Sequence, residues 1–413
     1  MSTSSHPSSS AAQGAVGGGA RARSPLDPLA AASLEAIRSR GTYRRMRVLE
    51  GAQGPRAVVD GRPVLHFAGS NYLDLAHHPE VIEASARAAR DHGCASGGSR
   101  LISGNLPIHE RLEEELAELL GTEAALVFST GYMANAGVIP ALAGRGDVIV
   151  SDALSHASII DGCRLSRAET RVFPHGDLEA LEATLRRVAT GRRHVLLAVD
   201  GLYSMDGDLA PLGEMLALAR RFGAMLLLDD AHGTGTLGAR GGGTAEHLGV
   251  DRGIDVVVGT LGKALGSFGA FVAGSAALRD LLVNLARSFI FSCALAPPQV
   301  EAARAALRLL GREAWRLQRL GANGERLRRL LAERGVSTHP STTHIIPVVL
   351  GENRRTMATC ERLLERGFFA QGIRHPSVPE GSARLRLTPM ATHSEEEIDA
   401  LADAVAAEVS QSR

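Results

Sequence analysis

The sequence predicts an α/β protein, with a mostly parallel sheet in a large domain and a smaller α+β domain near the C-terminal end. First, short apolar runs alternate with segments of helical period between about residues 75 and 298, as in a parallel sheet covered by helices on both faces. Second, the pattern changes after Pro298, where an Arg-, Leu- and Ala-rich helical stretch begins. Third, 413 residues with 45% hydrophobic content can bury a core large enough for two domains.

Six short apolar runs are the expected strands of the large domain. Segments with apolar residues at helical spacing separate them, for example residues 109–120, 178–188 and 212–221. In such sheets ligands gather beyond the carboxyl ends of the strands, so the residues that follow the runs are the functional candidates. The runs cover residues 125–128, 147–150, 195–199, 225–228, 255–258 and 270–273.

The two ends of the chain differ in composition from its middle. The first two dozen or so residues are rich in Ser, Ala and Gly and predict a disordered tail, because they cannot offset their ordering entropy. The C-terminal third predicts a helical stretch to about residue 335, then strand, helix, strand and helix over residues 344–350, 354–366, 383–387 and from Ser394. The expected divisions are a tail over residues 1–28, an N-terminal segment over 29–75, a large domain over 76–300 and a small domain over 301–413.

Composition excludes several classes of function. Lys+Arg and Asp+Glu both total 45, so no global field favours nucleic acid or an anionic membrane, and no apolar run approaches the roughly 20 residues of a membrane span. The four cysteines show no CxxC spacing, which favours reduced thiols in a cytoplasmic enzyme. His77, His78 and His109 lack metal-ligand spacing and no GxSxG motif occurs, so neither a metal site nor a serine hydrolase is expected.

Lys263 is the most informative residue of the chain. It follows the apolar run 255–258 and stands among small residues, which leaves room at its amine for a bulky group. Asp229 ends another apolar run and supplies a carboxylate. A lysine amine and an acidic partner for a ring nitrogen are what pyridoxal phosphate (PLP) chemistry requires, so the pair predicts a Schiff base between Lys263 and PLP.

The motif Asp229-Asp230-Ala231-His232 adds to this hypothesis. Asp229, directly after the apolar run, is the expected partner of a pyridinium, since a buried carboxylate without a cation is costly. His232 would reach a neighbouring oxygen. The residues 233–238 that follow match GxGxxG, but they do not directly follow the strand and lead into more glycines rather than a helix, which argues against a dinucleotide fold.

Three further motifs follow apolar runs, and each has a purely structural alternative. Residues 129–135 would form a phosphate cradle at a helix N-terminus, with Tyr132 against a ring, or an ordinary strand–helix turn. His156 would stack on a flat cofactor or serve as a hydrogen-bonded polar residue. Ser204 would bind a cofactor oxygen or belong to the chemistry of its turn.

Two arginines in the C-terminal third are candidates for binding a carboxylate. Arg374 and Arg386 flank residues 376–381, and Arg386 shares a strand face with Arg384 because side chains alternate along a strand. An inward-facing arginine suits bidentate capture of a carboxylate. The alternative is an exposed strand face that carries two arginines.

Together these segments resemble the α-oxoamine synthases, PLP enzymes of aminotransferase-like fold (fold type I). The resemblance runs from about Leu34 to about Val409. The number of matches and their order along the chain make it specific. The matching segments are Asn71-Tyr72-Leu73, residues 96–105, 129–132, 155–158, 204–207, 229–235 and 260–263, Phe291-Ser292 and residues 383–388.

The resemblance implies roles for particular residues. Lys263, which would also be the general base, His156 and Asp229 are the expected catalytic residues. The family is dimeric with sites at the subunit interface, so Ser292 would reach the neighbour's phosphate. The expected cofactor-binding residues are Gly131, Tyr132, His156, Ser204, Asp229, His232, Thr260, Lys263 and Ser292, and the expected substrate-binding residues are Arg44 or Arg45, Arg374, Ser377 and Arg386.

Within the family, the motifs are most similar to those of members that condense L-alanine with pimeloyl-CoA or a pimeloyl carrier protein to 8-amino-7-oxononanoate in biotin synthesis. The alternatives are family members that use glycine with acetyl-CoA, serine with a long acyl chain or substrates of secondary metabolism, an aminotransferase, and a non-catalytic cofactor-binding subunit. Cys293 and Ser70 stand where relatives commonly have threonine and asparagine, which leaves the choice of substrate open.

Overall fold

The computed structural model describes residues 24–189, 194–250 and 253–411, and the chain divides into units of residues 1–45 and 46–413. In the first unit, helix α1 (Leu26–Ser39) has no buried residue. Most of the expected tail lies outside the described residues, and residues 26–28 belong to α1. Within the described ranges no helix is long and apolar enough to cross a membrane.

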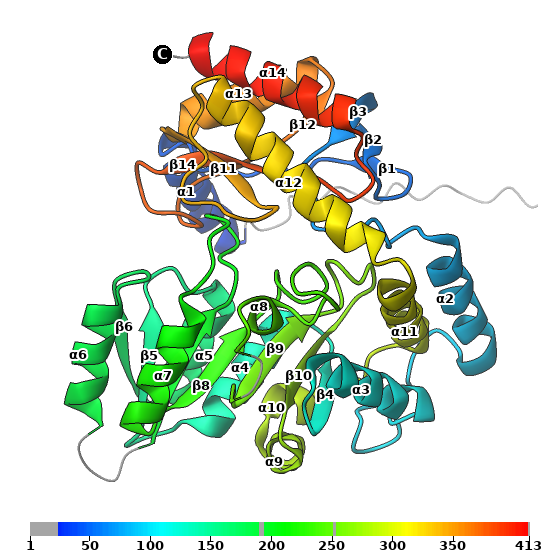
Figure 1. Ribbon diagram of the computed structural model, residues 1–413, viewed down its shortest axis with the longest axis vertical. Coiled ribbons are helices and arrows are strands. Elements are labelled where there is room, and N and C mark those ends of the chain that lie inside the picture. The colour runs from blue at the N-terminus through cyan, green and yellow to red at the C-terminus, as the bar shows by residue number, and fades with distance from the viewer. Residues whose placement is uncertain (1–23, 190–193, 251–252, 412–413) are drawn as a thin grey trace, which may run out of the picture. The chain divides into compact units, whose positions relative to one another are not determined.

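A seven-stranded sheet forms the centre of the larger part of the second unit (Figure 1). Its strand order is β4-β10-β9-β8-β7-β5-β6. The strands from β9 to β6 pair in parallel, and β10 runs antiparallel to both of its neighbours. The strands are β4 (Ala124–Phe128), β5 (Val148–Asp152), β6 (Glu169–Phe173), β7 (Val195–Asp200), β8 (Met225–Asp229), β9 (Val256–Thr260) and β10 (Ala270–Gly274).

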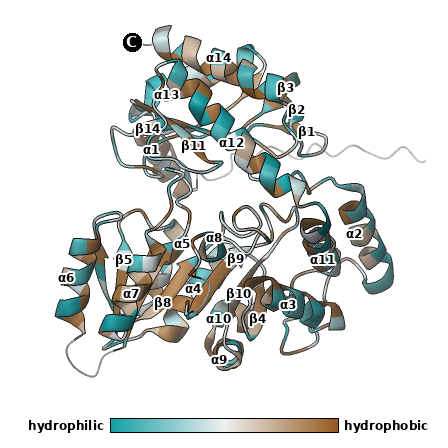
Figure 2. Ribbon diagram, in the orientation of Figure 1, coloured by the Kyte–Doolittle hydropathy of each residue, from teal (hydrophilic) through white to brown (hydrophobic). Residues whose placement is uncertain are grey.

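Helices cover both faces of this sheet, and its central strands are apolar along their length (Figure 2). Because successive side chains of a strand point to opposite faces, one face packs against α4, α5, α9 and α10 and the other against α2, α3, α6, α7 and α11. The helices are α2 (Pro79–His92), α3 (Pro107–Leu120), α4 (Gly131–Leu142), α5 (Ala157–Ser166), α6 (Leu178–Val188), α7 (Leu212–Phe222), α8 (Thr244–His247), α9 (Ala276–Leu285), α10 (Arg287–Ile290) and α11 (Pro297–Arg312).

The expectation of a mostly parallel sheet with helices on both faces is confirmed. The six apolar runs correspond to β4, β5, β7, β8, β9 and β10. Strand β6 was not foreseen because it lies at the edge of the sheet, where three of its five residues are exposed. An edge strand that is only partly covered does not produce a continuous apolar run.

Two small sheets form the remaining part of the second unit, β11-β14-β13 and β1-β2-β3-β12. Strand β12 pairs in parallel with β3, so residues 62–66 join the C-terminal third of the chain. This pairing is not evident from the sequence because both strands are short and partly exposed. The elements are β1 (Leu49–Glu50), β2 (Arg56–Val59), β3 (Arg62–His66), β11 (Ile346–Gly351), β12 (Phe368–Phe369), β13 (Gln371–Ile373), β14 (Ala383–Leu387), α12 (Trp315–Glu333), α13 (Asn353–Glu365) and α14 (Glu395–Gln411).

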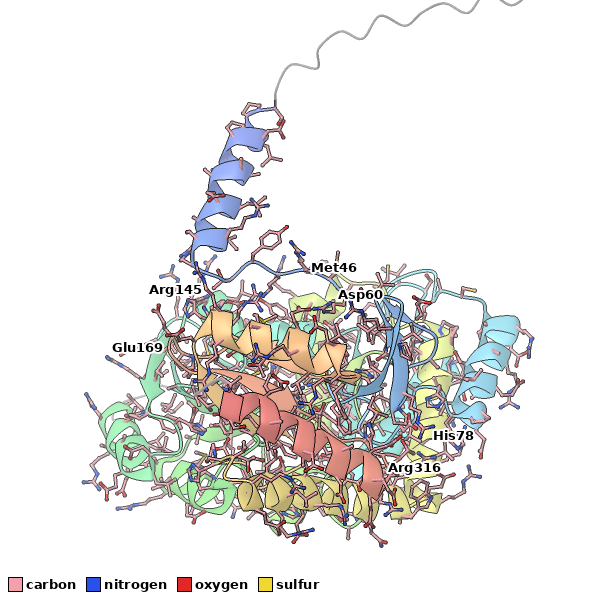
Figure 3. The ribbon with its side chains drawn as sticks, turned by 90° about the horizontal axis from the view of Figure 1, so that it is seen from above. Met46, Asp60, His78, Arg145, Glu169 and Arg316 are labelled. Atoms are coloured by element: carbon pink, nitrogen blue, oxygen red, sulfur yellow. The ribbon has the colours of Figure 1, made fainter. Side chains whose placement is uncertain are left out.

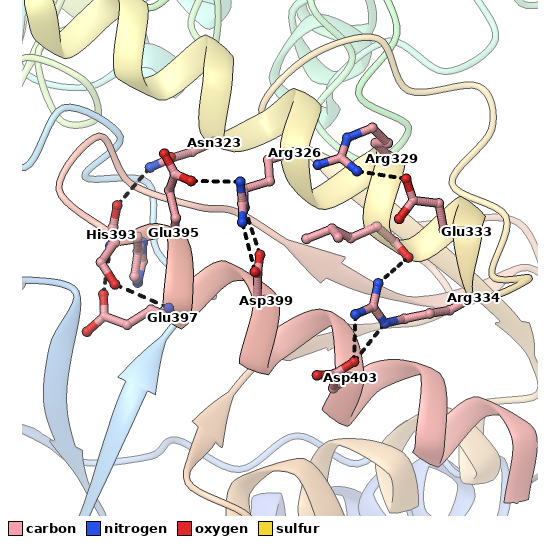
Figure 4. Close-up of polar contacts among 12 residues, drawn as sticks. Asn323, Arg326, Arg329, Glu333, Arg334, His393, Glu395, Glu397, Asp399 and Asp403 are labelled. Atoms are coloured by element: carbon pink, nitrogen blue, oxygen red, sulfur yellow. Dashed lines mark hydrogen bonds and ion pairs between the residues drawn. The ribbon is translucent and has the colours of Figure 1, made fainter.

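Helices α12 and α14 pack through an apolar layer with ion pairs at its rim (Figure 4). Leu327 of α12 and Leu401 of α14 belong to one buried cluster. Arg326 donates to both carboxylate oxygens of Asp399 at 2.7 and 2.8 Å and to Glu395 at 2.7 Å. The ion pairs therefore border a contact that the apolar side chains fill.

The start of α12 is tied to the segment that precedes α2. Arg316, which is 7% exposed, donates to Glu313 Oε2 at 2.6 Å and to the backbone oxygen of Leu73 at 2.7 Å. Glu313 also faces His78 Nε2 at 3.5 Å, and Figure 3 shows Arg316 and His78 on the same side of the molecule. This cluster connects the two parts of the second unit.

We predict that Leu401→Ala lowers the free energy of unfolding by about 2–5 kcal/mol, because it leaves a cavity in a fully buried layer. Arg326→Ala should cost about 1 kcal/mol or less, since partly exposed ion pairs contribute little. Urea unfolding followed by the fluorescence of Trp315, the chain's single tryptophan, measures both. Equal losses in the two variants would contradict the assignment of α12–α14 stability to the apolar layer.

Candidate active site

Acidic side chains end three neighbouring parallel strands at one edge of the central sheet. Asp152, Asp200 and Asp229 are the last residues of β5, β7 and β8. Strand β9 lies next to β8, and Lys263 follows the end of β9 by three residues. The carboxyl edge of the sheet therefore brings Asp229 and Lys263, far apart in sequence, to the same region.

Lys263 lies between β9 and β10 and is partly buried. Its Nζ is 2.9 Å from His232 Nε2. Burial lowers the pKa of Lys263 to about 8; Asp229 opposes this shift and Arg386 adds to it. Because this pKa lies below the ordinary value of 10.5, a much larger fraction of the amine is neutral near physiological pH, the form that a nucleophile or general base requires.

The two aspartates after β8 have different partners. Asp229 Oδ2 accepts a hydrogen bond from Asn135 Nδ2 at 2.6 Å, and Oδ1 accepts one from the backbone N–H of Ala231 at 3.1 Å. Asp230 instead accepts bonds from the backbone N–H and the hydroxyl of Thr244 at 3.0 and 2.5 Å. Burial raises the pKa of Asp230 to about 7. Asp230 thus holds the glycine-rich loop in place, whereas the carboxylate of Asp229 is available to the candidate site.

A chain of hydrogen bonds links Asp229 to His156. Asn135 Nδ2 donates both to Asp229 and to Ser158 Oγ, at 2.9 Å from the latter, and Ser158 Oγ is 2.7 Å from His156 Nδ1. The backbone N–H of Ser158 donates to His156 Nδ1 at 3.3 Å, so Nδ1 is an acceptor and the proton of the neutral ring is on Nε2. Desolvation lowers the pKa of His156, with Asp229 opposing, and this favours the neutral ring.

The start of α4 presents backbone amides to open space. Thr130 caps the helix by accepting a bond from the N–H of Met133 at 3.1 Å. The amides of Gly131 and Tyr132 have no acceptor in the part of the chain that the structure describes, and a Cβ at Gly131 would meet no atom within 4 Å. Free amides at the positive end of a helix dipole suit a phosphate group. The hydroxyl of half-exposed Tyr132 donates to Asp161 of α5.

Three residues expected to bind the cofactor, Thr260, Ser204 and Ser292, have contacts that do not show such a role. The Thr260 hydroxyl donates to a backbone carbonyl at 3.1 Å and closes the β9–β10 turn. Ser204 offers its backbone carbonyl, rather than its hydroxyl, to Arg386 Nε at 2.6 Å. Ser292 precedes a carbonyl that accepts a bond from Ser129 Oγ at 3.1 Å, next to the start of α4. The roles expected for these three residues stay predictions.

Strand β14 carries two buried arginines with different partners. Arg384 forms an ion pair with Asp206. Arg386 donates through Nε to the Ser204 carbonyl and through Nη2 to the Tyr72 hydroxyl at 2.9 Å. No carboxylate of the described ranges forms an ion pair with Arg386, although its exposure is 7%. An anionic ligand would balance the charge of such a buried guanidinium, so the expected role of Arg386 in binding a carboxylate stays a prediction.

Within the described residues, Arg386 has hydrogen bonds to Ser204 and Tyr72 but to none of the other expected substrate-binding residues. The register of β13 with β14 places Arg374 about 10 Å from Arg386 along the sheet. Ser377 is exposed beyond β13. Arg44 and Arg45 are exposed and belong to the first unit. Their substrate roles stay predictions.

The residues at this edge fit a PLP group. Lys263 supplies an amine with a lowered pKa, and Asp229 supplies a carboxylate held as an acceptor for a ring nitrogen. The open amides at the start of α4 suit the phosphate, and the exposed imidazole of His156 offers a flat surface for stacking. These would be the residues that hold the cofactor.

Asn135, Ser158 and Tyr72 take part in the site although none was singled out from the sequence. Asn135 lies one helical turn beyond Gly131, so its place on the same face of α4 was available from spacing. Ser158 follows His156 by two residues within a recognised motif. Tyr72 lies in a segment that matches the family, Asn71-Tyr72-Leu73, but its role was not evident because its partners are contributed by distant segments.

Comparison with known proteins identifies the family. The family described as aminotransferase class I and II matches residues 62–405. The 8-amino-7-oxononanoate synthase of Geobacter sulfurreducens is 50% identical over 378 residues, which cover 91% of this chain and 96% of the relative. The corresponding protein of Geobacter metallireducens is 52% identical over 370 residues, 89% and 94% of the two chains. The chain belongs to the α-oxoamine synthases. It is therefore a PLP-dependent acyltransferase.

Solved structures confirm the fold of this α-oxoamine synthase. Serine palmitoyltransferase from S. paucimobilis, solved with bound PLP, superposes with a TM-score of 0.88 at 33% identity and covers 94% of this chain and 99% of its own. The 8-amino-7-oxononanoate synthase of Francisella tularensis gives a TM-score of 0.73 at 25% identity and covers 84% and 98%. Fold type I and the PLP cofactor are thus confirmed.

A charged histidine braces the loop that carries Ser204. His175 Nδ1 is 3.0 Å from Asp152 Oδ1, and its Nε2 is 2.9 Å from Asp208 Oδ2. Burial opposes protonation, but the two carboxylates outweigh it and raise the pKa of His175 to about 10. His175 is therefore an imidazolium at neutral pH that joins the end of β5 to the loop after β7.

We predict that His175→Gln lowers the free energy of unfolding by about 2 kcal/mol at pH 6, the size of hydrogen bonds to a charged group. Because the folded pKa lies above the ordinary value of 6.5, the contribution of His175 is complete below pH 6.5 and is lost as the pH rises through 10. Urea unfolding of both proteins at pH 6, 8 and 10 measures it. A difference that does not change with pH would show that His175 acts by packing alone.

Proposed function

We propose that this chain condenses L-alanine with a pimeloyl thioester, giving 8-amino-7-oxononanoate, carbon dioxide and free thiol in biotin synthesis. The observation that carries this proposal is about 50% identity, over about 90% of the chain, to relatives named 8-amino-7-oxononanoate synthase. Arg386, buried and without a carboxylate partner in the described ranges, supports an amino-acid substrate. The expected cytoplasmic location stays a prediction.

The residues of the chain divide the work of this reaction. Arg386 would bind the alanine carboxylate through the N–H groups that Ser204 and Tyr72 do not use. Lys263 Nζ would take the proton from alanine Cα as general base. When bound, PLP draws electron density from that carbon into its ring. Asp229, oriented by Asn135, would hold a negative charge against the ring nitrogen.

The carbon–carbon bond then forms between alanine Cα and the thioester carbonyl, and the thiol departs. The carboxylate that Arg386 held leaves as carbon dioxide, and a proton returned to the carbon completes the aminoketone. Lys263, whose lowered pKa lets it both accept and release a proton near neutral pH, would serve both proton transfers. The reaction thus needs one amine of intermediate pKa, Lys263, and one fixed place for the substrate carboxylate, at Arg386.

A serine palmitoyltransferase-like activity is the second candidate. The TM-score with serine palmitoyltransferase, 0.88, exceeds that with the Francisella tularensis 8-amino-7-oxononanoate synthase, 0.73. Sequence identity favours the first candidate, at 50% against 33%. Identity carries more weight here because backbone similarity is shared by the whole fold, whereas substrate choice depends on side chains.

We further propose that the chain acts as a homodimer with its sites at the interface. Ile102 and Phe291 are 84% and 68% exposed, and the segments that carry them are joined by a bond from the N–H of Ala294 to the carbonyl of Gly98. Exposed apolar side chains beside a site support a partner surface. In such a dimer Ser292 would contact the phosphate bound by the partner subunit, as expected from the sequence.

We predict that the PLP-loaded protein releases thiol from pimeloyl-CoA at least about tenfold faster with L-alanine than with glycine, because one methyl group in a fitted pocket is worth that much. Thiol and carbon dioxide release with alanine, glycine and serine measure it. Lys263→Ala is the control and should lack the visible absorbance of the lysine-linked cofactor. Preference for serine with a long acyl-CoA would favour the second candidate, and a keto acid formed without thioester would indicate an aminotransferase.

We predict that Arg386→Lys weakens L-alanine binding about 100-fold, because an ammonium cannot replace a bidentate guanidinium. Arg384→Lys is the matched control on the same strand, and it should change alanine binding little because its partner is Asp206. Absorbance titration of each PLP-loaded variant with alanine gives the dissociation constants. A larger loss in Arg384→Lys than in Arg386→Lys would overturn the assignment.

A further inference from the structure

A continuous line of hydrogen bonds joins Arg386 to Lys263. Arg386 Nη2 is 2.9 Å from the hydroxyl oxygen of Tyr72, which is 2.8 Å from His232 Nδ1. On the other side of the imidazole, His232 Nε2 is 2.9 Å from Lys263 Nζ. Tyr72 is 1% exposed and His232 is 8% exposed, so water does not compete for these bonds.

The direction of each bond follows from the protons available. A guanidinium only donates, so the Tyr72 oxygen accepts from Arg386. The single hydroxyl hydrogen of Tyr72 then has two possible acceptors, His232 Nδ1 at 2.8 Å and Ser70 Oγ at 3.5 Å. The shorter contact has ordinary O–H···N length and the longer one is at the limit of a hydrogen bond. The lengths therefore favour donation from Tyr72 to His232 Nδ1 over donation to Ser70.

The position of the histidine proton follows in turn. Burial, together with the charges of Lys263 and Arg386, holds the pKa of His232 well below its ordinary value, so the ring is neutral. A neutral ring whose Nδ1 accepts a bond carries its proton on Nε2. Nε2–H therefore points at Lys263 Nζ, which accepts that bond only through the lone pair of a neutral amine.

Tyr72 is fixed independently of this line. Its ring packs edge-on against His344, with ring centres 4.3 Å apart and planes at 66°. Burial and the charge of Arg386 lower the pKa of His344 to about 3, so that neighbour is neutral. The backbone carbonyl of Tyr72 accepts a bond from the N–H of Ala391 at 2.8 Å. Tyr72 is thus held by two further segments far apart in the sequence.

We propose that Tyr72 is a positioning residue that makes Arg386 and Lys263 one unit, by anchoring the guanidinium and by fixing His232 as the tautomer that donates to the lysine nitrogen. The proposal rests on the proposed function, which assigns carboxylate binding to Arg386 and proton transfer to Lys263. Its physical content, the tautomer of His232 and the proton affinity of Lys263, does not depend on which substrate is used.

Loss of the Tyr72 hydroxyl has a definite consequence for Lys263. Without it no fixed donor faces His232 Nδ1, so the ring proton can reside there and Nε2 becomes an acceptor. An acceptor at 2.9 Å favours the ammonium form of Lys263, whose pKa then rises. The other charged or titratable groups that face this pair are Asp229, Asp200, Arg386, His344 and His156, and they are unchanged by the substitution.

The test is Tyr72→Phe, which removes the hydroxyl and keeps the ring against His344. Cofactor-free protein is mixed with PLP over a range of pH, and the rate of uptake gives the midpoint for Lys263. We expect this midpoint to move upward by about one pH unit, the effect of one hydrogen bond to a titrating group. Alanine binding to the PLP-loaded variant should weaken by about tenfold, because Arg386 loses an anchor.

Two comparisons separate this effect from general damage. Tyr203→Phe removes a hydroxyl from another buried tyrosine, which packs against His175 and lies outside the line, and it should move neither quantity. In a His232→Gln background, Tyr72→Phe should leave the uptake midpoint where His232→Gln alone puts it, because the coupling passes through the imidazole.

The outcomes are distinguishable from failure of the proposed function. An unchanged midpoint in folded Tyr72→Phe, or an equal rise in Tyr203→Phe, overturns the inference whatever substrate the enzyme uses. If Tyr72→Phe does not fold, nitrogen NMR of histidine-labelled wild type decides, with the His232 signal assigned by its loss in His232→Gln. A bare Nδ1 and a protonated Nε2 support the inference, and the reverse overturns it.

Discussion

The structure depends on one electrostatic arrangement, a lysine amine of lowered pKa and a fixed carboxylate at the same edge of a buried sheet. Lys263 owes its lowered pKa to burial more than to any single neighbour. Asp229 owes its orientation to Asn135 and to the backbone N–H of Ala231. Neither group would keep its properties in water, where an amine is charged and a carboxylate rotates freely. The fold supplies the dry and rigid surroundings that both require.

The parallel sheet is what brings these groups together. Its strands end at a common edge, so residues separated by dozens of positions become neighbours. The same edge gathers carboxylates that would repel one another, and the structure gives the others their own partners: Thr244 for Asp230, His175 for Asp152 and the backbone N–H of His156 for Asp200. Asp229 is thereby left to face the position where the PLP ring nitrogen belongs. Much of the polar network around the site consists of hydrogen bonds to the carboxylates other than Asp229.

The C-terminal part supplies the buried arginine that we propose to bind the substrate carboxylate. Arg386 comes from β14, and it reaches the site through contacts with the Ser204 carbonyl and the Tyr72 hydroxyl. The cluster of Arg316, Glu313 and Leu73 holds α12 against the segment that precedes α2, which also carries Tyr72. The hydrogen-bonded line between Arg386 and Lys263 thus depends on the two parts being in contact. Neither part alone contains the complete line from guanidinium to amine.

The sequence by itself determined the strand runs, the covered parallel sheet and the lysine–aspartate pair, because continuous burial and strand-end motifs leave local signals in Val-, Leu- and Ala-rich runs. It also located Arg384 and Arg386 on one strand face. Only the tertiary structure decided which of these arginines has no ion pair with the described residues, that Asp230 holds a loop, and that β12 joins β3. It alone placed Tyr72 between His232 and Arg386. The physical reason is that hydrogen-bond partners are chosen by positions in space, which a periodic pattern of side chains along the chain does not encode.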